Sequence, residues 1–266
     1  MSTDLPLPVV GADLHHEELA AVRAGRLGRV HSWELVTGVD GPGTRLTVFL
    51  SGCLLRCQYC QNPDTWHEHD GMPTTLDELV AKLRRYAPAL RAAHGGVTLS
   101  GGEPLVQPAF TANVFRAARE LGLHTALDTS GFLGAHATDA LLDDTDLVLL
   151  DVKSGLPDTY RLVTGQEVAP TLAFGRRLAD RGTAMWIRFV LVPGLTDAPE
   201  NIDAVADAVA AWSTVQRVEV LPFHQLGRDK WTRLGIPYPL ADTRPPTPEQ
   251  TAAARDRFRA RGLTVY

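Results

Sequence analysis

The three cysteines of this 266-residue chain all lie within eight residues, as Cys53, Cys57 and Cys60 in the spacing C-x3-C-x2-C. Thiolates are soft ligands that favour iron–sulfur clusters, zinc or copper(I). Because an ordinary cubane cluster takes four protein ligands, three thiolates leave one iron open to a ligand from outside the protein. The spacing therefore predicts a [4Fe-4S] cluster that takes part in chemistry, rather than one that only holds the fold together.

Simpler explanations of the three cysteines compete with this one. A Cys3His zinc site with His67 or His69 as the fourth ligand is one alternative, although the chain has no second C-x2-C pair. An odd number of thiols packed this tightly does not fit a set of disulfides. A metal-stabilised binding module without turnover also stays open at this point.

The composition of the whole chain excludes some classes of partner. A net charge of −5 gives no electrostatic reason to expect binding to nucleic acid or to an anionic membrane. No apolar run approaches the ~18 residues that span a bilayer. The start of the chain lacks the basic and then apolar pattern of a signal peptide. Clustered free thiols without a secretion signal predict a cytoplasmic protein.

Short apolar runs alternate along the chain with stretches of helical period. Because strands that are apolar on both faces are typical of buried parallel sheets, these βα units predict an α/β fold, either doubly wound or closed as a barrel. Capping boxes are predicted at Thr75 with Glu78, at Asp197 with Glu200 and at Thr247 with Gln250. Strands are predicted at 46–50, 97–100, 124–128, 147–152, 185–191, 218–222 and 263–266, and helices at 75–92, 108–121, 136–143, 170–182, 198–212 and 247–261.

The length suits one large domain, since α/β barrels reach roughly 200–250 residues as a single unit. Residues 29–266 are predicted to form this core domain. Residues 1–28 are predicted to be an N-terminal extension whose role the sequence does not indicate. Functional sites in such folds lie at the carboxyl ends of the strands, so candidate residues are sought there.

Two aspartates end neighbouring predicted strands. An acidic side chain that closes an apolar strand is costly unless it is solvated, paired or bound to a cation. Asp128 and Asp151 therefore predict a small site of oxygen ligands for a hard cation. The alternative is a helix N-cap or a buried salt bridge with Lys153 or Arg188.

Other strand ends carry residues that suit a small polar ligand. The pair Gly101-Gly102 lets the backbone approach a ligand closely, although a plain tight turn would also need it. Lys153, Arg188 and His224 follow three different strands, and together they suit a carboxylate and the hydroxyls of a ribose. Ser100 and Ser130 lack the G-x-S-x-G pattern of a nucleophile, and no catalytic acid, base or nucleophile is predicted.

The series of motifs resembles the glycyl-radical-enzyme activases of the radical SAM superfamily over roughly residues 29–266. A lone Gly-Gly-Glu would be a weak signal, whereas the ordered series is specific. The motifs are Gly41-Pro42-Gly43-Thr44-Arg45, the three cysteines, Asp64-Thr65-Trp66, Ser100-Gly101-Gly102-Glu103-Pro104, Asp128-Thr129-Ser130-Gly131-Phe132, Asp151-Val152-Lys153, Trp186-Ile187-Arg188 and Leu221-Pro222-Phe223-His224.

The resemblance implies a fold, two cofactors and a set of residues that bind them. The fold is a single-domain partial (β/α)6 barrel of the radical SAM type. Cys53, Cys57 and Cys60 would hold the [4Fe-4S] cluster, and S-adenosyl-L-methionine would bind its open iron. A monovalent cation would lie at Asp128, Thr129 and Asp151. The residues implied to bind S-adenosyl-L-methionine are Tyr59, Cys60, Gln61, Gly101, Gly102, Asp151, Val152, Lys153, Arg188 and His224.

One position departs from the family. Gln61 stands where the family typically has a histidine, so a contact that needs an imidazole is in doubt there. Backbone contacts to the adenine remain compatible with glutamine. Tyr59, on the other side of Cys60, is either an adenine neighbour or an ordinary core aromatic.

The resemblance also implies what the chain acts on. No cysteine lies between Cys60 and Gly101, so the cysteine-rich insert of many activases of other glycyl radical enzymes is absent. This favours pyruvate formate-lyase as the protein substrate, with flavodoxin or ferredoxin as the electron donor. The alternatives are an activase of another glycyl radical enzyme and a radical SAM enzyme with a small-molecule substrate. Asp40 and the turn after it are candidates for gripping the substrate peptide.

Overall fold

A computed structural model describes residues 10–266, and residues 1–9 of the predicted extension lie outside it. Eight strands form one sheet in the order β3-β1-β2-β4-β5-β6-β7-β8. Six of them are parallel: β2 (Thr44–Leu50), β4 (Gly96–Gly101), β5 (His124–Thr129), β6 (Leu147–Asp151), β7 (Met185–Leu191) and β8 (Val215–Pro222). The parallel strands that the sequence predicts from 46 to 222 are therefore confirmed.

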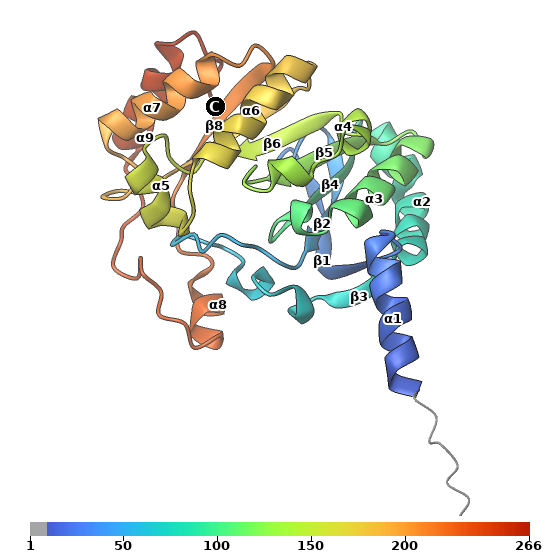
Figure 1. Cartoon of the computed structure of the whole chain (residues 1–266). Coiled ribbons are helices and arrows are strands. Elements are labelled where there is room, and N and C mark those ends of the chain that lie inside the picture. Colours follow the sequence, from blue (N-terminus) through green and yellow to red (C-terminus); the bar gives the residue numbers. More distant parts are fainter. Residues whose placement is uncertain (1–9) are drawn as a thin grey trace, which may run out of the picture.

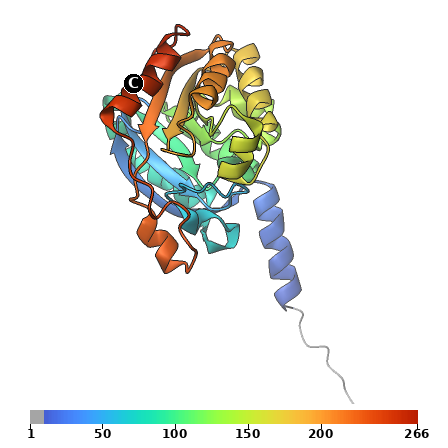
Figure 2. The same ribbon diagram turned by 90° about the vertical axis from the view of Figure 1, so that its left-hand side faces the viewer.

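Two further strands extend the sheet beside β2. The antiparallel strand β1 (Leu27–Thr37) pairs with β2 and, through its first residues, with the short β3 (Met72–Thr75). The sheet curves without closing, and the loop after β1 reaches across to β7, where the Val39 carbonyl accepts from Arg188 (Figure 2). The result is a partial barrel.

Most of the helices cover the outer face of the curved sheet (Figure 1). Within residues 10–266 none of these helices is long and apolar enough to cross a bilayer. The helices are α1 (Val10–Arg23), α2 (Leu76–Ala92), α3 (Pro108–Glu120), α4 (Asp139–Asp143), α5 (Pro157–Thr164), α6 (Ala169–Arg181), α7 (Pro199–Ala210), α8 (Arg228–Arg233) and α9 (Pro248–Arg259).

Local signals in the sequence explain several helix ends. The capping boxes of Thr75 with Glu78 and of Thr247 with Gln250 are both present at the starts of α2 and α9. The box predicted for Asp197 with Glu200 is wrong. Ala198 caps α7 without a side-chain bond, because the carboxylate of Asp197 instead accepts from the backbone of Gly194.

Other predicted elements need correction. The strand predicted at 263–266 is reduced to a single bridge between Val218 and Val265, where Val218 N–H donates to the Thr264 carbonyl and Tyr266 N–H donates to the Val218 carbonyl. The helix predicted at 136–143 is shorter, since a 3-10 turn over Gly134–His136 precedes α4. The sequence patterns did not reveal β1, β3, α5 or α8.

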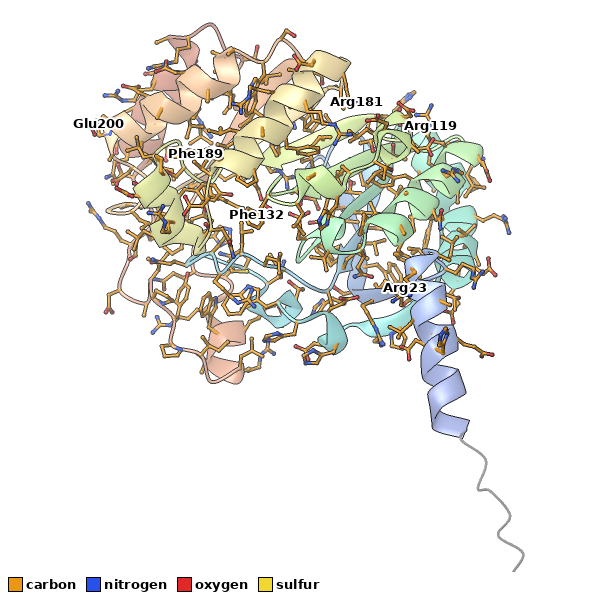
Figure 3. All side chains as sticks on the ribbon, viewed as in Figure 1. Arg23, Arg119, Phe132, Arg181, Phe189 and Glu200 are labelled. Carbon is orange, nitrogen blue, oxygen red and sulfur yellow. The ribbon has the colours of Figure 1, made fainter. Side chains whose placement is uncertain are left out.

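Alternation along the strands separates two faces of the sheet. The outer face packs against the helices in the main hydrophobic core, and side chains fill that space (Figure 3). The inner face carries a small apolar layer that includes Ala126, Leu149 and Trp186. The residues two positions further along these strands are Asp128, Asp151 and Arg188, so they point to the same inner side, one layer nearer the strand ends. This layer begins the functional site.

Candidate active site

A loop directly after β2 carries the three cysteines. Gly52 begins it with φ of +102°, in the region that favours glycine. Because the loop has no regular structure, its backbone donors are satisfied by other segments. Cys53 N–H donates to the Trp66 carbonyl at 3.0 Å, and Gln58 N–H donates to the Val163 carbonyl at 3.0 Å. The loop is thus fixed on both sides by hydrogen bonds within the protein.

The three thiols line one cavity of about 260 Å³ at the carboxyl ends of the parallel strands. Burial raises the pKa of all three thiols, that of Cys57 to about 12, with Lys153 acting in the opposite direction on Cys57 and Cys60. Three buried thiolates therefore need positive charge beside them, which is what the irons of a cluster supply. The donor set fits an iron–sulfur cluster.

The zinc alternative finds no support in this arrangement. Within residues 10–266 no group of three His, Cys, Asp or Glu side chains is placed to hold a single metal ion. His67 and His69 are exposed, stack on each other at 5.4 Å between ring centroids, and do not line the cavity. In a cubane cluster each thiolate binds a different iron, so the sulfurs need not converge on one point.

Most of the other predicted residues line the same cavity. The structure brings together Tyr59, Gln61, Gly101, Gly102, Asp128, Thr129, Asp151, Lys153, Arg188 and His224 with the three cysteines. Val152 does not join them. Its side chain is fully buried in the main core, and its N–H donates to the Arg188 carbonyl at 3.0 Å. The sheet explains this difference, because successive residues of a strand face opposite sides.

The register of the sheet aligns a row of charges on the inner face. Asp151 of β6 is opposite Arg188 of β7, which is in turn opposite Glu219 of β8. The Arg188 guanidinium lies 3.2 Å from the Asp128 carboxylate, 3.1 Å from Asp40 and 3.3 Å from Glu219. Burial opposes the charge of Arg188, and the surrounding carboxylates raise its pKa above the ordinary value. No motif in the sequence marks Glu219 for this role.

Each of the two strand-end aspartates has a cation beside it. Lys153 lies 2.6 Å from the Asp151 carboxylate, and Arg188 pairs with Asp128. Burial raises the pKa of Asp128 to about 6, while Arg188 lowers it. Ser100, its neighbour on β4, donates to the other oxygen of Asp128 at 2.6 Å. These are the salt bridges that the sequence left open as the alternative to a cation site.

The glycine pair is required by the packing of the backbone. A Cβ on Gly101 would lie 2.3 Å from the backbone nitrogen of Leu50, and a Cβ on Gly102 would lie 2.3 Å from the Gly52 carbonyl oxygen. Gly101 also has φ of +108°. The pair therefore lets the ends of β2 and β4 meet while both glycines line the cavity.

Glu103, the next residue in the chain, links the ends of β4 and β5 by hydrogen bonds. Its buried carboxylate accepts from Thr129 Oγ1 at 2.7 Å, from Ser130 Oγ at 2.6 Å, and from the N–H groups of Leu105 and Ser130. Burial raises its pKa, and these bonds oppose the rise. The Gly-Gly-Glu motif contained this residue, but its role depends on contacts that are distant in sequence.

Gln61 bonds within the protein. Its amide donates to the Tyr59 carbonyl at 3.3 Å and to the His224 carbonyl at 3.1 Å. Trp231 of α8 donates from Nε1 to the Cys60 carbonyl at 2.9 Å and packs edge-on against Trp66. The segment after β8 thus closes over the cysteine loop from the side opposite β4.

Tyr59 lies at the inner side of this loop. Its ring is buried, with the Lys153 ammonium 5.8 Å from the ring centroid. Among the described residues the hydroxyl of Tyr59 finds no hydrogen-bond partner, and burial raises its pKa. An orphaned buried hydroxyl on the cavity wall is one point at which a polar ligand would gain a bond.

Comparison with known proteins agrees with this fold and site. Residues 47–206 match the Radical SAM superfamily, and the chain belongs to this superfamily. A radical SAM methyltransferase from Sphaerobacter thermophilus is 20% identical with a TM-score of 0.61, over 99% of this chain and 82% of that chain. A domain of a pyruvate-formate lyase-activating enzyme from Bacteroides vulgatus is 24% identical with a TM-score of 0.55, over 65% and 98%. Both show the fold.

Closer relatives define the family. A pyruvate formate-lyase-activating enzyme of Clostridium pasteurianum is 44% identical over 216 residues, which is 81% of this chain and 90% of the relative. A pyruvate formate-lyase 1-activating enzyme of Escherichia coli K12 is 40% identical over 225 residues, or 84% and 92%. Within the superfamily, the chain belongs to the pyruvate formate-lyase-activating enzymes. The predicted partial barrel and the predicted class of enzyme are thereby confirmed.

Proposed function

We propose that this chain activates pyruvate formate-lyase by placing a radical on a glycine of that protein. The observation that carries the proposal is the single cavity in which three thiols meet the charged strand ends. It occurs in a chain that is 40–44% identical to activating enzymes of this name. Membership of the superfamily implies a [4Fe-4S] cluster and S-adenosyl-L-methionine.

Residues on opposite sides of the cavity would hold the two cofactors. Cys53, Cys57 and Cys60 would bind three irons, and S-adenosyl-L-methionine would bind the fourth. When bound, the cluster supplies one electron that splits S-adenosyl-L-methionine into methionine and a 5′-deoxyadenosyl radical, which takes a Cα hydrogen from the partner's glycine. The protein supplies position, charge and exclusion of water.

The charged strand ends would bind the methionyl part of the ligand. Gly101 and Gly102 line the cavity beside the cysteine loop and leave room for backbone contacts. The buried ammonium of Lys153 and the guanidinium of Arg188 would each attract the carboxylate only in part. Asp151 already engages Lys153, and Asp128 and Glu219 already engage Arg188. Tyr59, Gln61 and His224 would line the nucleoside side.

We also propose that a monovalent cation binds at Asp128, Thr129 and Asp151. Two carboxylates and a hydroxyl on one cavity wall are oxygen ligands that a hard cation prefers. To bind there, the cation must take the place of the Lys153 ammonium beside Asp151 or of the Arg188 guanidinium beside Asp128. Activation measured in potassium and in choline buffers tests this, and equal rates in both would contradict it.

Other aspects of the proposed function follow from the family alone. The electron donor would be flavodoxin or ferredoxin, and the free cysteines suit a reducing cytoplasm and an anaerobic metabolism. Activation of another glycyl radical enzyme is the second candidate. It remains open because nothing in the cavity itself names the protein whose glycine enters it.

The deciding experiment adds the reconstituted protein, S-adenosyl-L-methionine and a chemical reductant to pyruvate formate-lyase. We expect a glycyl radical doublet by electron paramagnetic resonance, together with 5′-deoxyadenosine. Cys57→Ala should abolish both, whereas His67→Ala, which changes an exposed residue outside the cavity, should leave both intact. Deoxyadenosine without a radical on the partner would overturn the choice of substrate and leave the superfamily chemistry standing.

A further inference from the structure

The cysteine loop presents two different faces. Alternate side chains, those of Cys53, Leu55, Cys57 and Tyr59, line the cavity. The residues between them point the other way: Leu54 is 50% exposed, Arg56 is exposed and Gln58 is half-buried. One layer of backbone therefore separates the sulfurs from the molecular surface. This outer face therefore offers a way to the sulfurs that avoids the cavity.

Helix α5 adds a second leucine to this outer face. Gln58 donates from Nε2 to the Leu162 carbonyl at 2.8 Å, and Arg56 N–H donates to the Thr164 carbonyl at 2.8 Å. Gln166 donates to the Leu54 carbonyl at 3.0 Å. Leu162 is 62% exposed although its backbone is held firmly in place. We call Leu54, Arg56, Gln58 and Leu162 the outer patch.

The outer patch carries one positive charge that no carboxylate of the described residues neutralises. The Arg56 guanidinium donates to the Cys53 carbonyl at 2.7 Å and to the Leu55 carbonyl at 2.8 Å, and it lies 4.8 Å from the Trp66 ring centroid. Arg161, beside Leu162, differs because Asp158 and Glu167 pair with it. Arg56 is thus a fixed cation flanked by two exposed leucines.

The proposed function requires that an electron reach the cluster from another molecule. All three cysteines of the chain belong to the cluster loop, so no second cysteine-bound cluster can relay it. The cavity side of the loop must face S-adenosyl-L-methionine and the partner's glycine. A donor that entered there would displace both, whereas the outer patch stays accessible while the cavity is filled.

Resting on that function, we propose that the outer patch docks a small acidic flavoprotein that carries one electron. The exposed dimethylbenzene edge of its flavin is apolar and suits Leu54 and Leu162, and its acidic rim complements Arg56. The anionic flavin hydroquinone loses one electron and becomes the neutral flavin radical, and the cluster is reduced by that one electron without proton transfer. Such transient redox contacts are small, in keeping with a patch of this size.

The test compares three charge-changing variants of the cluster-loaded protein. Leu162→Asp places a negative charge on the patch without touching the cysteine loop, because only the backbone of Leu162 bonds to that loop. Arg56→Glu reverses the patch charge. The matched control is Leu19→Asp, an exposed leucine of α1, which extends from the side of the molecule away from α5 (Figure 1). A purified flavodoxin, fully reduced, serves as the donor.

Two quantities are measured at low salt: the affinity for oxidised flavodoxin by calorimetry, and the rate of cluster reduction by stopped-flow absorbance. We expect Leu162→Asp and Arg56→Glu to weaken binding and slow reduction by about tenfold, and the difference to shrink as salt is added. Leu19→Asp should stay within about twofold of the parent protein. Dithionite, which needs no docking, should reduce all four proteins alike.

Equal flavodoxin affinities and rates for Leu162→Asp and Leu19→Asp would overturn the proposal. The proposal would also be overturned if the patch variants slowed cluster reduction by an acidic ferredoxin and left reduction by flavodoxin unchanged. The patch would then dock an iron–sulfur carrier. If dithionite does not reduce the cluster of Arg56→Glu as it reduces that of the parent protein, the substitution has damaged the loop. The comparison of Leu162→Asp with Leu19→Asp then decides the test. A parent protein that takes electrons from flavodoxin but never activates pyruvate formate-lyase would refute the proposed function and not the docking surface.

Discussion

Single residues hold this cavity together, and Glu103 is one of them. Its buried carboxylate accepts four hydrogen bonds from the segments that end β4 and β5. In Glu103→Gln one of these donors would face an amide NH2 instead of an acceptor. We expect a loss of about 2 kcal/mol in the free energy of unfolding, the usual cost of an unsatisfied buried donor. Urea unfolding measures it, with the exposed Glu200→Gln as the control.

The same residue should affect ligand binding, because it holds Thr129 and Ser130 on the cavity wall. A rise in the dissociation constant for S-adenosyl-L-methionine of about tenfold is expected if Glu103 positions these residues. An unchanged stability and affinity in Glu103→Gln would mean that the carboxylate is already protonated and donates one of its bonds.

At the scale of elements, Trp231 of α8 holds the cysteine loop from outside through one hydrogen bond and one aromatic contact, and Lys230 beside it donates to Asn62 and Asp64. In Trp231→Phe the Cys60 carbonyl loses its donor, while a ring still packs on Trp66. We expect a destabilisation of about 1 kcal/mol and a faster loss of iron from the reconstituted protein. Iron release to a chelator, followed by absorbance, measures the second effect. Trp33→Phe, on the distant β1, is the matched control.

His124, at the start of β5, should make the free energy of unfolding depend on pH. Burial, and then Arg45, lower the pKa of His124 below its ordinary value of 6.5. The unfolded chain therefore binds more protons than the folded one as pH falls below about 6.5. Stability should then decrease through that window, and it should be insensitive to His124 above it. Urea midpoints between pH 7.5 and 5.5 should show a smaller slope in His124→Gln than in the parent protein.

Elements with strong local patterns were predictable, and those defined by tertiary pairing were not. The apolar run of β7 has no competing interpretation, and its predicted bounds match the structure. The half-exposed β1 carries mixed polar and apolar residues on both faces and becomes a strand only because β2 offers it hydrogen bonds. Likewise the cysteines and strand-end charges could be found by type and spacing. Glu219 and Trp231 could not, because their roles depend on partners far away in sequence.

At the scale of the whole molecule, the described part of α1 meets the rest of the chain through few contacts. Most described side chains of α1 are exposed, and polar residues such as Glu17 and Thr75 line a cavity between α1 and the start of α2. The bonds that fix the start of the core come later, where Asn113 donates to the carbonyls of Ala24 and Gly25. Glu18 adds one partly exposed ion pair with Arg29.

Removal of residues 2–23 should therefore leave a folded and active protein. The loss in the free energy of unfolding should be about 2 kcal/mol or less, because the described side chains of α1, those of residues 16–23, bury little apolar area and exposed ion pairs contribute little. The glycyl radical yield on pyruvate formate-lyase should stay the same, since none of these described side chains lines the cavity. Urea unfolding and electron paramagnetic resonance measure the two. A truncated chain that unfolds, or that folds but no longer activates its partner, would show that α1 belongs to the working core.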